Sequence, residues 1–439
     1  MQKDNLAPPS GSRDFLPQEL AFRESVLTKV KQVFAGHGFQ PLDTPAFERL
    51  EVLSGKYGEE GEKLIFKILK RGDKAQSGEA DLALRYDLTV PTMRVYAHRR
   101  AELPRIFKRY QIGPVWRADR PGRGRFREFY QCDVDIIGTA SRLADVEVLL
   151  ALSAALQAVG LPRFRIRLNS RHVLKAMMTA HAVPADKQHA VIGALDKFDK
   201  IGLAGVGEEL GGLDLPAEVA ESLQSDLVGG EVEGRLRRRL RESEVGQRGL
   251  TEVDQIIAWL RPLIGLADIF FDPILARGLD YYTGPIFEFF AEGLPSSIAA
   301  GGRYDNLAGL FMKESVPVCG GSLGIERIMV ILQAQGAVAP TPAPTAYVTL
   351  WDEAAPEDSL SLAQSLRRAG VAAEIDLAGG ALSRQFKAAN ARGCRFVLVR
   401  GPDEVEAGTV QIKDMRSGAQ SAVALADAAD AIIAALGAA

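Results

Sequence analysis

The stretch ARGLDYYTGPIFEFF at residues 276–290 places one arginine, one acid and two tyrosines on a predicted strand. Strand alternation sends Arg277, Tyr281 and Phe287 to one face and Tyr282 to the other. An ordinary core strand would show plain apolar alternation. Here a cation and two phenols occupy positions that suit a pocket with a charge clamp and polar-tipped walls. We therefore expect this strand to form part of a binding site.

Two further stretches accompany the first, AAGGRYDNLAGLF at 299–311 and RADRPGRGRFREFYQCDVDIIG at 117–138. Together the three resemble the active site of the class II aminoacyl-tRNA synthetases, and specifically that of the histidyl-tRNA synthetase family. The resemblance runs from SGSRDFLP at 10–17 through the C-terminal part of the chain. The wording of RYDLTVP (85–91) and QCDVD (131–135) is closer to the eukaryotic-type branch of that family.

Bulk composition sets limits on the class of protein. A chain of 439 residues, 47% hydrophobic and 25% charged, predicts a globular protein of two or three domains. With 53 Lys+Arg against 56 Asp+Glu, any nucleic acid would have to bind local basic patches. Cys132, Cys319 and Cys394 have neither zinc-ligand spacing nor a disulfide pattern, so a reducing cytoplasm is expected. No secretion signal or membrane span is expected.

The order of the predicted elements indicates an α+β fold. The resemblance implies a class II antiparallel sheet core, a helical insertion and a C-terminal α/β anticodon-binding domain. We expect the first part of the core at 1–169, the insertion at 170–261, the second part of the core at 262–335, an Ala/Pro-rich linker at 336–345 and the anticodon-binding domain at 346–439. A helix over 20–39 that leads to Pro45 resembles the family's dimer-interface element, which implies a homodimer.

A basic hairpin is predicted around residues 117–127. Eight basic residues and one acid lie between Arg105 and Arg127. Such a hairpin could be an edge strand protected by its charges. Arg117 closes one strand and Arg125 opens the return strand, and arginine forks bind phosphate oxygens in a bidentate manner. No GxxxxGK[ST] loop is present, so side chains would have to hold any phosphates.

The resemblance implies a role in ATP binding for several of these residues. Arg117 would grip the α-phosphate, with Arg125 beside it, and Arg327 of GGSLGIER would face the γ-phosphate. Phe126, or alternatively Phe129, would stack on adenine. Arg277 would be a second cation at the reacting phosphorus. Magnesium is expected to accompany ATP, with Asp119 as a candidate ligand.

Histidine selection requires groups for the α-ammonium and for the imidazole. By resemblance, Asp87, Thr89 and Gln131 would serve the ammonium end. Asp135, Tyr282 and Tyr304 would line the imidazole end, and Arg277 and Tyr281 would complete the pocket. Taken singly, such acids and phenols more often cap helices, stabilise turns or fill cores. The hypothesis rests on their occurrence together.

The implied activity is ligation of histidine to the 3′ end of tRNA(His), through a histidyl-adenylate formed from L-histidine and ATP. One alternative is a catalytically silent paralog that regulates histidine biosynthesis. Such paralogs generally lack the anticodon-binding domain and often have a degraded RGLDYY block. This chain has an intact RGLDYY block and a C-terminal segment long enough for that domain. A second alternative is a pseudo-synthetase domain that senses uncharged tRNA, but no kinase-like segment accompanies it.

Overall fold

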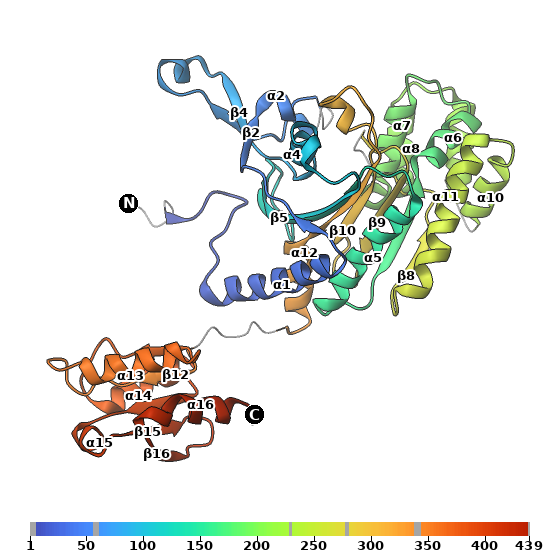
Figure 1. Ribbon diagram of the computed structural model, residues 1–439. Helices are drawn as coiled ribbons and strands as arrows, with labels where there is room; N and C mark the ends of the chain where they lie inside the picture. The colour runs from blue at the N-terminus through green and yellow to red at the C-terminus, as the bar shows by residue number, and fades with distance from the viewer. Residues whose placement is uncertain (1–5, 56–60, 228–230, 277–280, 338–343, 438–439) are drawn as a thin grey trace. The chain divides into compact units, whose positions relative to one another are not determined.

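The fold was analysed in a computed structural model that describes residues 6–55, 61–227, 231–276, 281–337 and 344–437. The chain divides into two compact units, one formed mainly by residues 22–338 and the other mainly by residues 339–439. Each unit has its own sheet. The predicted α+β class is confirmed, because a largely antiparallel sheet is combined with segregated helices (Figure 1).

The larger unit is organised by an eight-stranded sheet in the order β1-β5-β6-β11-β10-β9-β7-β8. Only the outer pairs, β1 with β5 and β7 with β8, are parallel. The strands are β1 (Gln40–Pro41), β5 (Phe107–Trp116), β6 (Glu128–Ile137), β7 (Arg165–Ser170), β8 (Asp268–Phe271), β9 (Pro285–Phe290), β10 (Ala299–Arg303) and β11 (Val318–Gly324). The predicted hairpin of basic residues is the β5–β6 pair.

The two faces of this sheet differ in chemistry. Helices α5 (Arg142–Ala158) and α12 (Ile325–Ala334) pack on one face, where Leu152 approaches Gly321 of β11 (Figure 1). On the other face, Asp135 lies opposite Arg109 of β5 and Gly320 of β11. Directly opposed residues of antiparallel strands share a face, so one face of the sheet packs against α5 and α12 and the other carries the buried Arg109–Asp135 pair. We call the second the polar face.

The N-terminal elements lie on both sides of the large sheet. They are α1 (Pro17–Gly36), α2 (Leu50–Leu53), the short helix η2 (Gly72–Ser77), α4 (Thr89–His98), η3 (Arg100–Glu102) and a three-stranded sheet of β2 (Phe47–Arg49), β4 (Ala80–Leu84) and β3 (Lys67–Leu69). The first helix packs on the face covered by α5 and α12, where the ring centroid of Phe34 lies 6.0 Å from that of Tyr110 of β5, and the other elements lie on the side of the polar face (Figure 1). Proline at the third position of α4 suits a helix start, where no intrahelical partner is needed for its missing N–H.

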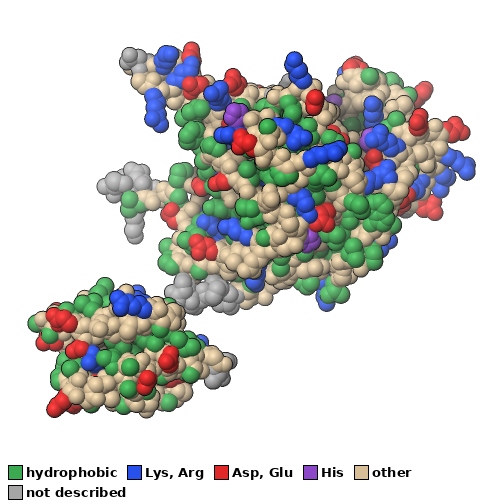
Figure 2. Space-filling model, viewed as in Figure 1, with side chains coloured by type: hydrophobic (Ala, Val, Ile, Leu, Met, Phe, Trp, Pro, Cys, Tyr) green, Lys and Arg blue, Asp and Glu red, His purple; other side chains and the backbone are tan. Residues whose placement is uncertain are grey.

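The described part of the segment expected as an insertion, 170–261, consists of helices joined by turns, apart from Ser170 at the end of β7. Its helices are α6 (Arg171–Ala180), α7 (Gln188–Asp196), α8 (Phe198–Gly211), α9 (Ala217–Leu227), α10 (Val232–Arg239) and α11 (Glu244–Leu260). Helix α11 packs on α6 and also on α5 and β7 of the core. The turn η4 (Arg261–Leu263) then leads to β8. Acidic and basic side chains are interspersed on the face drawn in Figure 2.

The smaller unit has a mixed five-stranded sheet in the order β13-β12-β14-β15-β16. Its elements are β12 (Ala346–Val348), α13 (Glu357–Arg368), β13 (Ala373–Ile375), α14 (Leu382–Ala391), β14 (Phe396–Val399), α15 (Pro402–Ala407), β15 (Thr409–Asp414), β16 (Gln420–Ala424), η6 (Leu425–Asp427) and α16 (Ala428–Gly437). Strand β16 was missed by sequence analysis because its side chains are mostly exposed and give no apolar alternation.

One prediction about strand boundaries is wrong. The strand expected over 276–290 begins at Pro285, and the described residues 281–284 before it are not in strand conformation. Proline has no N–H for a ladder, so it suits the first position of a strand rather than an interior one. The predicted alternation therefore does not apply to Tyr281 and Tyr282. Among the described residues, no helix has the length and apolar character to cross a bilayer.

Candidate active site

Three of the predicted ATP-binding arginines come together from distant parts of the sequence. Arg117 follows β5, Arg125 lies in the β5–β6 loop and Arg327 lies in the first turn of α12. Burial, followed by the positive charges of Arg125 and Arg117 nearby, lowers the pKa of Arg327. Gly124 has a positive φ of 72°, and a Cβ there would lie 3.3 Å from Cγ of Arg327. The loop thus lies against the Arg327 side chain.

Of these three arginines, Arg117 contacts aromatic rings. The Arg117 guanidinium lies 4.3 Å from the ring centroid of Tyr86 and 5.3 Å from that of Phe129, and its Nε donates to the Tyr86 carbonyl at 3.0 Å. Phe126 is instead covered by the guanidinium of Arg13 at 4.4 Å. Both rings predicted as adenine-stacking partners therefore carry an arginine guanidinium on one side.

Asp119, the candidate magnesium ligand, is buried and forms an ion pair with Arg125 at 2.7 Å. Its backbone carbonyl accepts a hydrogen bond from Arg127. The described residues contain no group of three or more His, Cys, Asp or Glu side chains arranged to hold a metal ion. Magnesium that enters with a triphosphate takes only one or two protein carboxylates, so the role of Asp119 as a ligand stays a prediction. Its contact in the structure is the ion pair with Arg125.

Three tyrosines from two of the signature stretches form one aromatic group. The ring centroids of Tyr281 and Tyr282 are 4.8 Å apart, and they lie 5.7 and 6.3 Å from that of Tyr304. The prediction that Tyr281 and Tyr282 point to opposite faces is therefore wrong. Both tyrosines lie before β9, in a segment whose backbone is not a strand and does not alternate its side chains. Both rings can therefore reach Tyr304.

The carboxylate of Asp135 lies at the centre of the predicted imidazole end. It is 2% exposed, accepts a hydrogen bond from the Tyr304 hydroxyl and pairs with Arg109. A Cβ at Gly320 would collide with this carboxylate and would come within 2.7 Å of the Tyr304 hydroxyl. Glycine on β11 therefore leaves the space in which Asp135 and Tyr304 meet. We call Arg109, Asp133, Asp135 and Tyr304 the Asp135 cluster.

The acids of this region influence one another. Burial raises the pKa of Asp135 to about 7 and that of Asp133 to about 6, and the Arg109 charge opposes both shifts. The negative charge of Asp87 raises both pKa values further. Two predicted binding residues, Asp87 and Asp135, are thus close enough to interact, although 48 positions separate them in the sequence.

The predicted ammonium end is less completely assembled. Asp87 is 4% exposed and accepts a hydrogen bond from the Val90 N–H at 3.0 Å, which caps α4. Thr89 is half-buried at the first position of that helix. The Gln131 amide contacts Ser322 Oγ at 3.4 Å, and its buried Oε1 has no hydrogen-bond partner among the described residues. The Asp87 carboxylate thus serves as a helix cap, and a ligand role remains a prediction.

Arg109 is a residue whose importance sequence analysis missed, because it was counted only among the basic residues near the phosphates. It is fully buried and lies directly opposite Asp135 in the β5–β6 register. The signal was available in the hairpin. Counting outward from the loop pairs Arg109 with Asp135, and the burial of alternate residues along β5 places both inside. Arg277, in contrast, lies outside the described residues.

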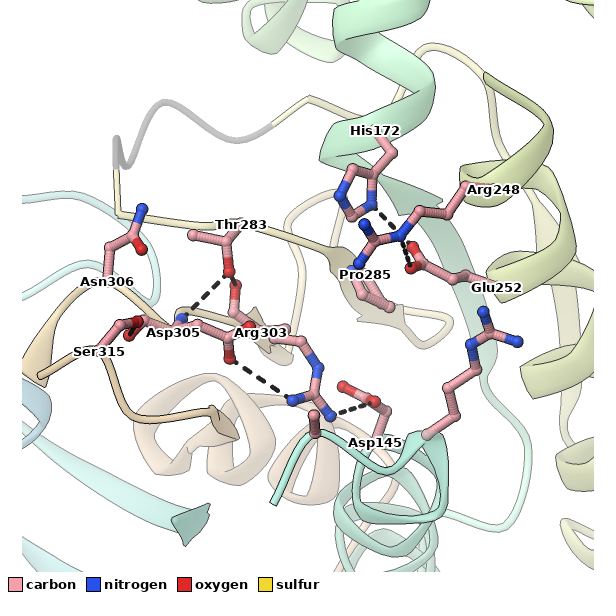
Figure 3. Close-up of a pocket in the computed structure, with 12 residues that line it drawn as sticks. Asp145, His172, Arg248, Glu252, Thr283, Pro285, Arg303, Asp305, Asn306 and Ser315 are labelled. Carbon is pink, nitrogen blue, oxygen red and sulfur yellow. Dashed lines mark hydrogen bonds and ion pairs between the residues drawn. The ribbon is translucent and has the colours of Figure 1, made fainter. Parts of the chain in front are cut away.

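A cavity of about 380 Å³ is lined in part by residues that adjoin Tyr282 and Tyr304 in the sequence (Figure 3). Thr283, Arg303 and Asp305, the sequence neighbours of Tyr282 and Tyr304, form one side of it, and His172, Arg248 and Glu252 form another. We call it the Arg303 cavity. Arg303 pairs with Asp145 at 2.6 Å, and Glu252 pairs with His172 at 2.9 Å. No described residue predicted to bind ATP or histidine lines it.

Two family models match this chain. The model of the histidyl-tRNA synthetase family matches residues 11–328, and that of the anticodon binding domain matches residues 335–435. A histidine–tRNA ligase of Gloeobacter violaceus is 38% identical, with 97% of this chain and 98% of the relative covered. One of Rhodopirellula baltica is 36% identical, with 98% of each covered.

The solved structures show the same relationship. The crystal structure of histidyl-tRNA synthetase from Nostoc sp. PCC 7120 superposes with a TM-score of 0.80 at 31% identity and covers 98% of this chain and 99% of that one. The match of the family model over most of the chain and the near full-length relatives above 30% identity lead to one conclusion. The chain belongs to the histidyl-tRNA synthetase family.

Proposed function

We propose that this chain activates L-histidine with ATP and transfers it to the 3′ end of tRNA(His). The observation that carries the proposal is the placement of two sets of residues on one sheet. Arg117 follows β5 and Arg327 follows β11, both next to the start of β6. Asp135 lies farther along β6, where it meets Tyr304, which follows β10. A triphosphate bound by the first set and an imidazole held by the second would bring the amino acid carboxylate toward the α-phosphate.

The first chemical step needs positive charge around a phosphorus that gains negative charge. Arg117 would hold the α-phosphate with Arg125 beside it, and Arg327 would hold the γ-phosphate. Arg277 would approach the reacting phosphorus from the amino acid side. Each such oriented cation is worth about 3 kcal/mol of transition-state stabilisation. The substrate carboxylate is itself the nucleophile, so no protein nucleophile is required.

Recognition of histidine would use one set of groups for the α-ammonium and another for the imidazole. Asp87, Thr89 and Gln131 would bind the α-ammonium, with the buried Gln131 Oε1 available as an acceptor. Asp135 would accept an imidazole N–H, and Tyr281, Tyr282 and Tyr304 would enclose the ring. A site built to hydrogen-bond a polar side chain rejects analogues that lack it, because its buried polar groups are then left unpaired.

Magnesium would enter with ATP and be held chiefly by phosphate oxygens, since it retains several waters and takes few protein ligands. Its chemistry would be neutralisation of the charge on the triphosphate. Asp119 is the acid closest to the predicted phosphate site by sequence, and its Oδ1 pairs with Arg125, so its other oxygen would bind the ion.

Residues 346–439 would bind the anticodon of tRNA(His), in line with the family match over 335–435. A homodimer formed around α1 and Pro45 would cover the neighbouring Phe47, which is 53% exposed. Light scattering would test this, because a monomer's mass would contradict it. The three cysteines are all unpaired and buried, which supports a reducing compartment such as the cytoplasm.

The regulatory paralog remains a weaker alternative. A structure described as an ATP phosphoribosyltransferase regulatory subunit/histidyl-tRNA synthetase from Bacillus halodurans C superposes with a TM-score of 0.72, but at 23% identity. That likeness shows the fold alone. The near full-length relatives above 30% identity are histidine–tRNA ligases, and the anticodon-binding match favours the enzyme.

The deciding experiment is ATP–pyrophosphate exchange with each amino acid in turn. We expect exchange with histidine and little with the others. Arg117→Ala and Arg277→Ala should each lower histidine-dependent exchange by about 100-fold or more. Arg123→Ala removes an exposed arginine from the same loop as a matched control and should change it by less than about twofold. Absence of histidine-dependent exchange in the parent protein would refute the function, and full activity of Arg277→Ala would refute that residue's role.

A further inference from the structure

Arg109 occupies an unusual position for an arginine, because it is fully buried beneath the polar face of the sheet. Its Nη2 pairs with Oδ2 of Asp135, which lies opposite on β6. Oδ1 of the same carboxylate accepts the Tyr304 hydroxyl. Asp135 is therefore fixed through both oxygens, by a cation on one side and a phenol on the other. None of the Arg109 nitrogens makes a hydrogen bond to another described residue beyond this ion pair.

We propose that Arg109 is a positioning residue for histidine selection, which holds Asp135 ionised and oriented so that this carboxylate accepts the imidazole N–H of the substrate. The inference rests on the proposed function, and it explains which residue keeps the Asp135 carboxylate of the pocket negatively charged. An ionised carboxylate offers only acceptors, whereas a protonated one presents a donor that mismatches an imidazole N–H.

The charges around Asp135 explain why a cation is needed. From β6 it is faced by Asp133, from the segment before α4 by Asp87, and from the end of β10 by Tyr304. On β11, Gly320 carries no charge, and burial keeps the pKa of the neighbouring Cys319 thiol well above its usual range. Arg109 of β5 is thus the cation that opposes two neighbouring acids. Without it, burial and those two acids would favour the protonated form.

The ionisation of Asp135 is balanced close to neutral pH even with Arg109 present, since its pKa is about 7. Loss of the Arg109 charge would raise this pKa, and loss of the Asp133 charge would lower it. A change at either residue should therefore move the pH dependence of histidine use, in opposite directions. An arginine with a purely structural role would not produce this pattern, because it would alter folding or all substrates together.

The test measures ATP–pyrophosphate exchange between about pH 6 and 9 with the full chain and four variants. Arg109→Met removes the charge, Arg109→Lys keeps it, and Asp133→Asn removes the competing acid. Lys108→Met is the matched control, because Lys108 is the adjacent β5 residue on the other face and pairs with Glu147 at 2.8 Å. The readouts are KM for histidine, KM for ATP and the pH at which kcat/KM for histidine reaches half its plateau.

We expect Arg109→Met to raise KM for histidine about tenfold or more and to move the pH midpoint upward by about one unit, equivalent to a tenfold change in ionisation. KM for ATP should stay within about twofold, and Arg109→Lys should recover part of the loss. Asp133→Asn should move the midpoint downward, and Lys108→Met should leave it unchanged. If Arg109→Met does not fold, Asp133→Asn and Arg109→Lys carry the test.

The proposal is overturned if Arg109→Met raises both KM values equally, if its midpoint matches that of Lys108→Met, or if Asp133→Asn shifts the midpoint upward or not at all. A parent protein that shows no histidine-dependent exchange would instead refute the proposed function. The two failures are therefore distinguishable, because the inference is judged only by differences between variants of an active enzyme.

Discussion

The Asp135 cluster and the Arg303 cavity both bury acids and arginines, but they balance charge differently. In the Arg303 cavity, Asp145 has Arg303 at 2.6 Å, and Glu252 has His172 at 2.9 Å and Arg248 at 3.3 Å. In the Asp135 cluster, Asp133 and Asp135 share Arg109, with Asp87 nearby. Buried charge that its neighbours leave uncompensated is costly and is concentrated at functional sites.

The Arg303 cavity and the Asp135 cluster meet at two consecutive residues, Arg303 and Tyr304. Arg303 closes β10 and faces α5, whereas Tyr304 follows it and reaches Asp135 on the polar face. One strand end thus holds the core through Arg303 and serves the predicted pocket through Tyr304. We expect changes on the two sides to separate stability from activity.

The largest effect should come from Asp135→Asn. The amide would place a donor where the substrate needs an acceptor, so kcat/KM for histidine should fall by about 100-fold or more, which corresponds to about 3 kcal/mol. Steady-state exchange at varied histidine measures it, with KM for ATP as the internal control. Retention of more than about a third of the parent kcat/KM would remove Asp135 from the imidazole site.

Asp145→Ala should act on stability. It leaves the buried Arg303 without its closest acid, which typically costs about 3 kcal/mol of the free energy of unfolding. Urea unfolding followed by circular dichroism measures the change. The folded variant should keep kcat/KM for histidine within about threefold of the parent. A loss as large as that of Asp135→Asn would show that the two regions are not separable.

The pH dependence of stability should differ between the parent and Asp135→Asn. The folded pKa of Asp135 is raised to about 7, above that of an unfolded chain, so the folded state binds a proton that the unfolded state has lost. Stability should therefore fall as pH rises toward 7, by up to about 1.4 kcal/mol per unit for this group, and level off above it. Urea midpoints at several pH values should give a shallower slope for the variant, and equal slopes would contradict the raised pKa.

The smallest effect is expected for Arg248→Ala at the rim of the Arg303 cavity. This side chain is 65% exposed and pairs with Glu252 one helical turn away. Exposed pairs at this spacing contribute about 0.3–0.5 kcal/mol. Thermal unfolding should therefore shift only slightly. A destabilisation comparable with that of Asp145→Ala would mean that Glu252 depends on Arg248 rather than on His172.

Local patterns predicted much of the fold and part of the site. Apolar periodicity located α1, and the pattern of the basic hairpin located β5 and β6, because these elements bury one face along their length. Strand alternation gave the wrong start for β9, which begins at Pro285, and did not detect the exposed strand β16. The roles of Tyr281 and Tyr282 were drawn from resemblance, whereas their orientation depended on a loop conformation that alternation does not describe.

The sequence by itself determined the kinds of chemistry available. It supplied the arginines of the β5–β6 hairpin, the glycines that admit large side chains beside them, and the tyrosines of the signature stretches. Those follow from residue type and short spacing, which are local properties.

Only the tertiary structure decided which acid pairs with which basic side chain. Tyr304 reaches Asp135 across 169 positions, and Arg303 reaches Asp145 across 158. Such pairings depend on strand register and on how helices cover the sheet. The charge state of a buried acid is a sum over all neighbours in space. Acids and arginines of the same types therefore form a one-to-one ion pair at Asp145 and Arg303, and a group in which two acids share one arginine at Asp135.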